Sequence, residues 1–490
     1  MGVGLSRPLD RDPRCATLAP VWSPFVDAFV DTLHAGGQAV HPPPPRRAPL
    51  FARTAKNDSP EAPSTTETGA SSGADAGGDA KTAASSRATR TTETARRTHS
   101  LRSPGKPLGP LFRPAVRRLV AIGDVHGDLR ATTEALRAGG VLDDENKWCG
   151  GETTVVQVGD QLDRGGDEIA ILFLLERLRF EARRAGGELI VMNGNHETLT
   201  AAGRFRYADD ASRGDLRRWR GRQLFGAALK HACGEKPGQC TLLGADAAAE
   251  AVERGRKGFP MTPPPRAGAA RDASSVTKTE TETFTKKKKS GSVAPRPGAS
   301  TYAIHADASA SSWMPRLAAF APGGPLATRF LAHQPVVCAV GSTVFAHGGV
   351  LRSHARVGLR RANRETAEWL AGSLAGAPPA HVTGADSVVW ARTYSHPDAF
   401  RCDCDALDEA LKALPGMARV VVGHTIQGEK GVNAACAGKA LRVDVGMSRG
   451  CGGRAPEVLE ILDDGAGGIS KLRWDAERKK VVREPVEGAT

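Results

Sequence analysis

The stretch "VVQVGDQLDRGGDE", residues 155–168, passes directly from apolar residues to charged ones. The run Val155–Val158 has the composition of a buried strand, and Asp160, Asp163 and Arg164 follow it closely. Carboxylates at the end of a buried strand lose hydration, so they need charged partners, and a metal ion is one such partner. The stretch therefore predicts a strand that ends at a metal site.

Four further strand-like runs end in the same way, with polar residues and turn glycines. They are "RRLVAIGDVHGD" (117–128) with Asp124 and His126, "ELIVMNGNHET" (188–198) with Asn195 and His196, "STVFAHGGV" (342–350) with His347, and "ARVVVGHTIQ" (418–427) with His424. A run of helix formers that a glycine pair ends, "DEIAILFLLERLRFEARRAGG" (167–187), lies between two of them. Strands that alternate with helices predict an α/β fold, with the ligands on loops beyond the strand ends.

The polar residues at these strand ends form a chemically consistent set. A single His after a strand is usually part of a hydrogen-bonded structure, and a single Asp in a glycine turn usually serves the turn. Together, however, the five runs supply two Asp, three His and one Asn, and such donors suit Mn, Fe or Zn. Six ligands are appropriate for two ions, roughly 3.5–4 Å apart, that share one carboxylate. We interpret the set as a dinuclear hydrolase site, with Arg164 as a charge clamp and His196 as a proton donor.

Five sequence blocks carry a family resemblance. In chain order they are "GDVHGD", "GDQLDRGG", "GNHET", "HGG" and "VGHT", and they resemble the signature blocks of the calcineurin-like metallophosphoesterases, in particular the phosphoprotein phosphatase group. The stretches "NGNHETLTAAGRFRYAD", "DSVVWAR" and "LRVDVGMSRG" further resemble the bacterial-like (Shewanella-like) protein phosphatases of plants and algae, and the cysteines resemble the second plant type. The resemblance spans about residues 119–461. It implies a four-layer α-β-β-α sandwich of two mixed sheets.

The resemblance also implies a role for each candidate residue. The metal ligands would be Asp124 and His126 for the first ion, Asp160 as the bridge, and Asn195, His347 and His424 for the second ion. His196 would be the general acid, oriented by Asp163. Arg164 and Arg392, the latter in "VWAR", would hold the phosphate. Two guanidinium groups match a phosphoryl group, because its charge is spread over three oxygens.

These roles predict a hydrolase of phosphoric monoesters. The favoured reading is a protein serine/threonine phosphatase that acts on phosphoproteins, in which a metal-bridging hydroxide attacks in line and manganese is the expected metal, with iron or zinc as alternatives. A small-molecule phosphatase or dinucleoside-polyphosphate hydrolase would keep the same fold and metals, since substrate choice lies in the loops. An inactive phosphoprotein-binding scaffold would be expected to lack a ligand or His196, and every mapped position is filled.

Composition divides the 490 residues into three parts. Residues 1–115 are predicted to be a disordered N-terminal tail with a targeting role left open, although "VWSPFVDAFVDTL" (21–33) within it has one apolar helical face. Residues 116–465 are predicted to be the catalytic domain, interrupted by a low-complexity insertion at about 258–300. Residues 466–490 are predicted to be a C-terminal tail.

The formal net charge of +13 does not by itself indicate nucleic-acid binding. Much of the basic excess lies in the N-terminal tail and in Lys286–Lys289, and no zinc-finger, helix-turn-helix or aromatic-basic pattern accompanies it. No apolar run reaches transmembrane length. "MGVGLS" fits the N-myristoylation pattern at Gly2. The compartment is left open between cytosol, plastid, mitochondrion and a lipid-anchored pool, as are the regulatory partner and the oligomeric state.

Nine cysteines in a chain of this length do not make a disulfide scaffold. The resemblance to the second plant type points to the mitochondrial intermembrane space and to oxidised cysteines, with Cys402, Cys404, Cys436 and Cys451 as the candidates. A disulfide between Cys402 and Cys404 would be strained, so we expect one of the two to pair elsewhere. The disulfide state itself stays open.

Overall fold

The strands that carry the first three ligand motifs lie side by side in one sheet. The computed structural model describes residues 26–33, 109–232 and 310–489. In the sheet order β12-β11-β10-β2-β3-β4, the strands are β2 (Arg118–Ile122), β3 (Thr154–Gln157), β4 (Glu188–Val191), β10 (Glu457–Leu462), β11 (Ile469–Asp475) and β12 (Lys480–Pro485). β2, β3 and β4 pair in parallel, whereas β10, β11 and β12 pair antiparallel with their neighbours. The carboxyl ends of the three parallel strands therefore meet at one edge.

The remaining two ligand motifs belong to a second sheet. Its order is β1-β5-β6-β7-β9-β8, and its strands are β1 (Phe112–Arg113), β5 (Val337–Val340), β6 (Thr343–Ala346), β7 (Arg419–Val422), β8 (Asn433–Ala435) and β9 (Ala440–Arg442). β6, β7 and β9 pair in parallel. Each sheet thus contains neighbouring parallel strands that end in candidate ligands, β2, β3 and β4 at one end of the first sheet and β6 and β7 in the middle of the second.

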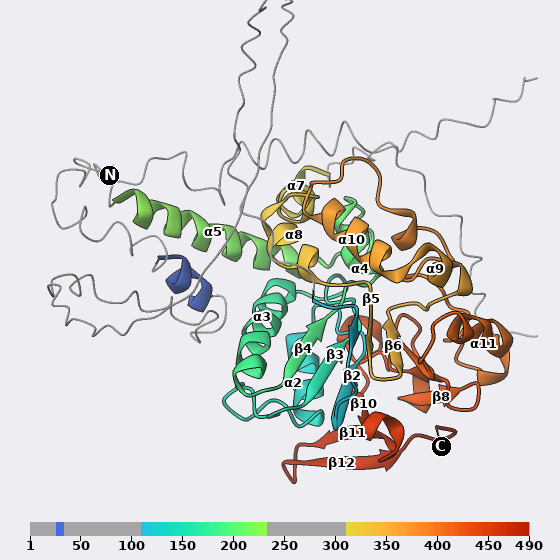
Figure 1. Cartoon of the computed structure of the whole chain (residues 1–490). Coiled ribbons are helices and arrows are strands. Elements are labelled where there is room, and N and C mark those ends of the chain that lie inside the picture. Colours follow the sequence, from blue (N-terminus) through green and yellow to red (C-terminus); the bar gives the residue numbers. More distant parts are fainter. Residues whose placement is uncertain (1–25, 34–108, 233–309, 490) are drawn as a thin grey trace, which may run out of the picture. The chain divides into compact units, whose positions relative to one another are not determined.

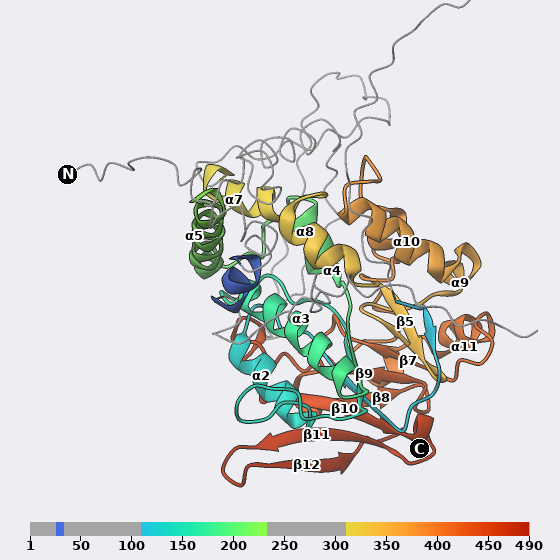
Figure 2. The ribbon, with the colours of Figure 1, turned by 60° about the vertical axis from the view of Figure 1, so that its left-hand side comes forward.

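The two sheets pack face to face and helices cover both outer faces (Figures 1 and 2). Val155, Leu459, Phe345 and Val421, drawn from both sheets, share one buried core. On the first sheet lie α2 (Leu129–Ala138) and α3 (Glu168–Arg184), and on the second α9 (Arg352–Val357), α10 (Leu359–Leu370) and α11 (Cys404–Lys412). The predicted four-layer sandwich is confirmed.

A third group of helices packs beyond the sheets. Leu172, Leu216, Phe320 and Trp369 share a buried apolar cluster that joins α3 and α10 to this group. The added helices are α4 (Asn195–Ala201), α5 (Asp210–Ala232), α7 (Ala310–Phe320) and α8 (Pro325–Arg329). Single 3-10 turns lie at Leu331–His333, Ala380–Val382, Ala399–Arg401, Gly428–Lys430, Arg449–Cys451 and Asp463–Gly465. Within the described ranges, none of the helices is both long and apolar enough to cross a lipid bilayer.

The predicted C-terminal tail at 466–490 is wrong. β11 and β12 extend the first sheet beyond β10, with Leu472 and Val486 buried (Figure 1). Leu472 is the one buried residue of β11, and charged side chains occupy much of the rest of both strands. Charged side chains are usual on strands at the edge of a sheet, because they discourage pairing with other chains. Such strands resemble a solvated tail in composition.

The predicted N-terminal tail at 1–115 is partly wrong. Residues 26–33 form a helix with Val26 and Val30 buried, and β1 lies before residue 116. The Asp31 carboxylate pairs with Arg329 of α8, with oxygen–nitrogen distances of 2.8 and 3.0 Å. A short amphipathic helix gains this order by burying its apolar face against the domain. The rest of the tail, with the Gly2 motif, and the insertion at 258–300 lie outside the described residues.

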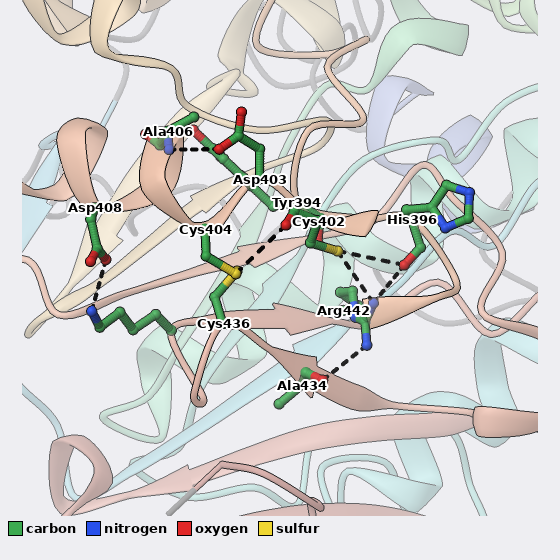
Figure 3. The surroundings of a disulfide bond; sticks show 11 residues. Tyr394, His396, Cys402, Asp403, Cys404, Ala406, Asp408, Ala434, Cys436 and Arg442 are labelled. Atoms are coloured by element: carbon green, nitrogen blue, oxygen red, sulfur yellow. Dashed lines mark hydrogen bonds and ion pairs between the residues drawn. A yellow bond between two sulfur atoms is a disulfide. The ribbon is translucent and has the colours of Figure 1, made fainter. Parts of the chain in front are cut away.

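One disulfide joins Cys404, the first residue of α11, to Cys436 just after β8 (Figure 3). The expectation that Cys402 and Cys404 are not bonded to each other is confirmed. Cys402 is a buried thiol beside the guanidinium of Arg442, and Cys451 is also unpaired. The bond closes a segment with a sequence separation of 32 residues.

Removing this disulfide is expected to lower stability while leaving the catalytic rate intact. A disulfide that closes a loop of this length restricts the unfolded chain, so Cys404→Ser should reduce the free energy of unfolding by about 3–4 kcal/mol. Denaturant unfolding of the oxidised and reduced proteins measures this difference. Cys149→Ser, at an exposed free thiol, is the matched control. Identical unfolding curves before and after reduction would contradict the expectation.

Candidate active site

The five ligand motifs converge on one pocket between the two sheets. Residues from four of the five strand ends line it, together with side chains that the motifs do not contain. The lining comprises Asp124, His126, Asp160, Arg164, Asn195, His196, Tyr207, Trp390, Arg392, His424, Ile426, Asp444 and Cys451. His347 and Asp163 lie behind this lining and are fully buried. All ten residues singled out from the sequence thus lie in or directly behind one pocket.

Asp160 is the centre of the arrangement. Its Oδ2 lies 3.6 Å from His126 Nε2 on one side and 3.1 Å from His347 Nε2 on the other. Two groups of potential ligands share it, namely His126 with His196 and His347 with His424, and within each group the ligand atoms lie within 4.8 Å of one another. Asp124 adjoins the first group, because its Oδ2 is 4.0 Å from His126 Nε2.

The imidazole rings are oriented to ligate a cation. Nδ1 of His126 faces the Leu162 carbonyl at 3.0 Å, and Nδ1 of His347 faces the Val158 carbonyl at 3.1 Å. A backbone carbonyl there places the proton on Nδ1 and leaves the Nε2 lone pair free. Nε2 of His424 is buried without a hydrogen-bond partner. Burial lowers the pKa of His126 to about 3 and, with help from His347 and Arg392, lowers that of His424 well below its usual range.

Several acceptors crowd together in this pocket, and a cation would relieve the crowding. The Asn195 Oδ1 lies 2.9 Å from Nε2 of His347, so with the proton on Nδ1 two lone pairs face each other. Burial, followed by the charges of Asp444 and Asp160, raises the pKa of Asp124 well above its usual range. Burial also raises the pKa of Asp444 to about 6. Buried carboxylates this close to one another are stable when they are paired or coordinate metals. The donors present therefore fit divalent cations.

His196 differs from His126 and His347 in the group that its Nδ1 faces, which is a carboxylate and not a backbone carbonyl. Its Nδ1 lies 2.7 Å from Oδ2 of Asp163, and its Nε2 points into the pocket, 3.8 Å from Asp160 Oδ2. Burial lowers the pKa of His196, but the charges of Asp160 and Asp163 outweigh it and the net shift is upward. A carboxylate behind an imidazole stabilises its protonated form. The geometry thus suits a proton donor.

Arg164 and Arg392 both line the pocket. The backbone N–H of Arg164 donates to the Tyr207 carbonyl at 2.8 Å, and its guanidinium carbon lies 5.3 Å from the centre of the Tyr207 ring. Nη1 of Arg392 donates to the His424 carbonyl at 3.0 Å and to Thr425 Oγ1 at 2.6 Å. Both side chains are therefore held in place at the rim.

The backbone around the site is strained. Positive φ angles occur at His126 (40°), Asp160 (58°), Asp163 (66°), Arg164 (63°) and His424 (66°). Non-glycine residues rarely adopt this conformation, and such strain concentrates at functional sites because the surrounding structure must enforce it. Close approach also fixes the glycine of the "GNH" motif, since a Cβ at position 194 would lie 2.2 Å from Asp160 Oδ1.

Comparison with known proteins gives the family. Residues 117–237 match the calcineurin-like phosphoesterase family. The Shewanella-like protein phosphatase 2 of Arabidopsis thaliana is 40% identical over 324 residues, which cover 66% of this chain and 69% of the relative. The chain belongs to the Shewanella-like protein phosphatases. It is therefore a phosphatase, a hydrolase of phosphoric monoesters, from a family that uses divalent metals.

Two further proteins match this Shewanella-like phosphatase over different shares of its length. The Shewanella-like protein phosphatase 1 of Plasmodium berghei is 35% identical over 92 residues, or 19% of this chain and 25% of the relative. A solved cold-active protein tyrosine phosphatase has a TM-score of 0.46 and 16% identity, over 78% of this chain and 83% of the other.

The Shewanella-like phosphatase site also contains residues that the sequence analysis did not single out. Asp444, Tyr207 and Trp390 line the pocket, and the buried Glu197 binds the backbone of the loop that carries Asp160. Glu197, Tyr207 and Asp444 occur within the quoted stretches "GNHET", "GRFRYAD" and "LRVDVG". The signal was present there, but a role could not be assigned without knowing which side chains face the pocket.

Proposed function

We propose that this phosphatase is a dinuclear-metal protein serine/threonine phosphatase. The observation that carries the proposal is the Asp160 carboxylate, which two groups of buried ligands share within 4.8 Å. A carboxylate between two such groups is the arrangement that a two-ion site requires. The relative that is named a protein phosphatase, at 40% identity, supports phosphoproteins as the substrates.

The proposed ligands divide between two ions. The first ion would be held by Asp124, His126 and Asp160, and the second by Asp160, Asn195, His347 and His424. Bound there, the ions would polarise a phosphoryl oxygen and lower the pKa of a water molecule. Mixed imidazole and carboxylate donors suit manganese, with iron or zinc as alternatives.

The side chains at the rim have separate proposed tasks. Arg164 and Arg392 bind the phosphate oxygens, because guanidinium groups pair with them in a fixed, bidentate geometry. His196 donates a proton from Nε2 to the leaving oxygen. Asp163 holds the opposite side of the ring, so that Nε2 keeps its direction and its proton.

The acid favours serine and threonine esters over the alternatives. An alkoxide is a strong base and leaves readily only when it receives a proton. The phenolate of tyrosine is a weaker base, with a pKa of about 10 for its phenol, and a nucleotide phosphate is weaker still, with a pKa of about 6. A buried His196–Asp163 pair is therefore most useful for an alkyl phosphate. Hydrolysis of dinucleoside polyphosphates would gain little from it.

A substrate panel tests the proposal. With manganese present, kcat/KM is measured on phosphoserine and phosphothreonine peptides, a phosphotyrosine peptide and dinucleoside tetraphosphate. We expect the serine and threonine peptides to react at least about tenfold faster than the others, since general acid catalysis contributes roughly 100- to 10,000-fold where a proton is needed. Faster turnover of the dinucleotide or of phosphotyrosine would replace the proposed specificity.

A further inference from the structure

A buried arginine on α7 lies directly behind the proposed general acid. We propose that Arg316 is a positioning residue, which fixes the Asp163 carboxylate and thereby aligns His196 for proton donation. The inference rests on the proposed role of His196. Arg316 is fully buried and lies outside the pocket lining, so it acts through Asp163 and does not touch substrate.

The two oxygens of Asp163 have different partners. Oδ1 accepts a hydrogen bond from Nη2 of Arg316 at 2.9 Å, and Oδ2 faces Nδ1 of His196 at 2.7 Å. With one oxygen held by the guanidinium, the carboxylate cannot rotate without breaking a charged hydrogen bond. The other oxygen is thus kept in the plane and at the distance that the imidazole requires. The result is a continuous chain from α7 to the proton-donating ring.

Glu168 holds Arg316 from the other side. Its Oε1 accepts from Nη2 of Arg316 at 2.7 Å and from the backbone N–H of Asp163 at 2.5 Å, and its Oε2 pairs with Nη1. Thr200 Oγ1 and Ser212 Oγ lie 3.2 and 3.3 Å from the guanidinium nitrogens. Groups on α3, α4 and α5 therefore hold the guanidinium in place, in addition to its contact with Asp163.

Stability alone does not explain this arrangement. Buried ion pairs are often no more stabilising than apolar residues of the same volume, because both charges lose their hydration. Glu168 already binds Arg316 through both of its oxygens, so the guanidinium of Arg316 has a counter-charge without Asp163. The additional contact to Asp163 gives the cluster a direct link to the His196 ring. Hydrogen bonds that hold such a side chain from behind typically alter activity by roughly 10- to 100-fold when they are removed.

The test uses the dependence of the rate on the leaving group. Arg316→Met should lower kcat on a phosphoserine peptide by roughly 10- to 100-fold, yet change kcat on 4-nitrophenyl phosphate by less than about threefold, because a good leaving group needs little protonation. KM and bound metal should stay near wild type. Arg316→Lys keeps the buried charge and should recover part of the loss. Since it preserves the charge balance, it also provides the test if Arg316→Met does not fold.

Two comparison variants are needed to interpret the result. His196→Asn should show the same leaving-group pattern at larger magnitude. If it does not, His196 is not the general acid, and the inference about Arg316 is refuted as well. If it does, but the Arg316 variants lose activity equally on both substrates or on neither, the positioning role is overturned and the proposed function stands. Arg329→Met, at an arginine that pairs with Asp31 on the helix 26–33 and with Glu176 on α3, should leave both rates unchanged.

Discussion

Asp160→Asn is expected to lower kcat/KM on a phosphoserine peptide by at least about 1,000-fold, beyond the roughly 10- to 100-fold that changes behind a metal site produce. The same protein should bind fewer than two manganese ions per chain. Asparagine has nearly the same shape as aspartate, so the fold should be retained. The loss of activity would therefore result from the missing charge of one carboxylate and not from unfolding.

The reason for this large effect is that Asp160 serves both ligand groups at once. Its Oδ2 lies within 3.6 Å of both His126 Nε2 and His347 Nε2, and its Oδ1 accepts the backbone N–H of His196 at 3.0 Å. An amide removes the negative charge and turns one of these oxygens into an N–H₂ group, which is a donor. If the N–H₂ group replaced Oδ2, neither proposed ion would have its shared ligand, and if it replaced Oδ1, the first turn of α4 would lose an acceptor; the charge is lost in both cases.

The measurement combines steady-state kinetics with metal analysis of the purified protein. Asp408→Asn, at an exposed carboxylate that pairs with Lys439 on the surface, controls for the loss of a charge. It should behave as wild type. A variant at position 160 that keeps two bound ions and more than about a tenth of the activity would refute the shared-ligand proposal.

The convergence of the candidate ligands could be predicted from sequence because each of the five motifs follows its own apolar strand. Buried parallel strands end at a common edge, so Asp124, Asp160 and Asn195 had to lie near one another once β2, β3 and β4 paired. The motif glycines marked the turns. That the second sheet brings His347 and His424 to the same place was inferred from the chemistry of the donor set and from the family resemblance, since no local pattern specifies how two sheets pack.

Other features could not be predicted, for two physical reasons. Arg316 follows a long low-complexity region, and only the folded chain brings α7 behind Asp163. Its one signal was a single charge in the otherwise apolar helix "ASSWMPRLAAF", residues 310–320. β11 and β12 were missed because the edge strand β12 and its neighbour β11 carry many charges, and charge density is also the mark of a tail.

Glu197 has the second largest expected effect, although it touches no substrate. Its two oxygens accept four backbone N–H groups, from Asp160, Gln161, Leu162 and Gly194, at 2.6–3.0 Å. Burial, together with the nearby charge of Asp160, raises the pKa of Glu197 to about 7. The side chain thus replaces regular backbone pairing for the loop between β3 and α3, where Asp160 and Asp163 adopt strained conformations.

Glu197→Gln should reduce both manganese affinity and kcat/KM by roughly 10- to 100-fold, because the new amide group would face two backbone donors with a donor of its own. Glu197→Ala would leave four buried N–H groups without acceptors, at roughly 1–3 kcal/mol each, against a total stability of about 5–15 kcal/mol for a typical domain. That variant should fail to accumulate as folded protein.

Glu457→Gln is the matched control for the two Glu197 variants. Glu457 also binds a loop backbone, through Val432 N–H at 2.9 Å, but the 3-10 turn Gly428–Lys430 separates that contact from the candidate ligand His424. Its replacement should lower stability slightly and leave metal affinity unchanged. Metal titration and thermal unfolding of Glu197→Gln and Glu457→Gln, with the soluble yield of Glu197→Ala, then separate the effect of a buried carboxylate on metal affinity from its effect on stability. If Glu197→Gln bound manganese like wild type, the strained loop would hold Asp160 in place without Glu197, and the ligand geometry would depend on the strand ends alone.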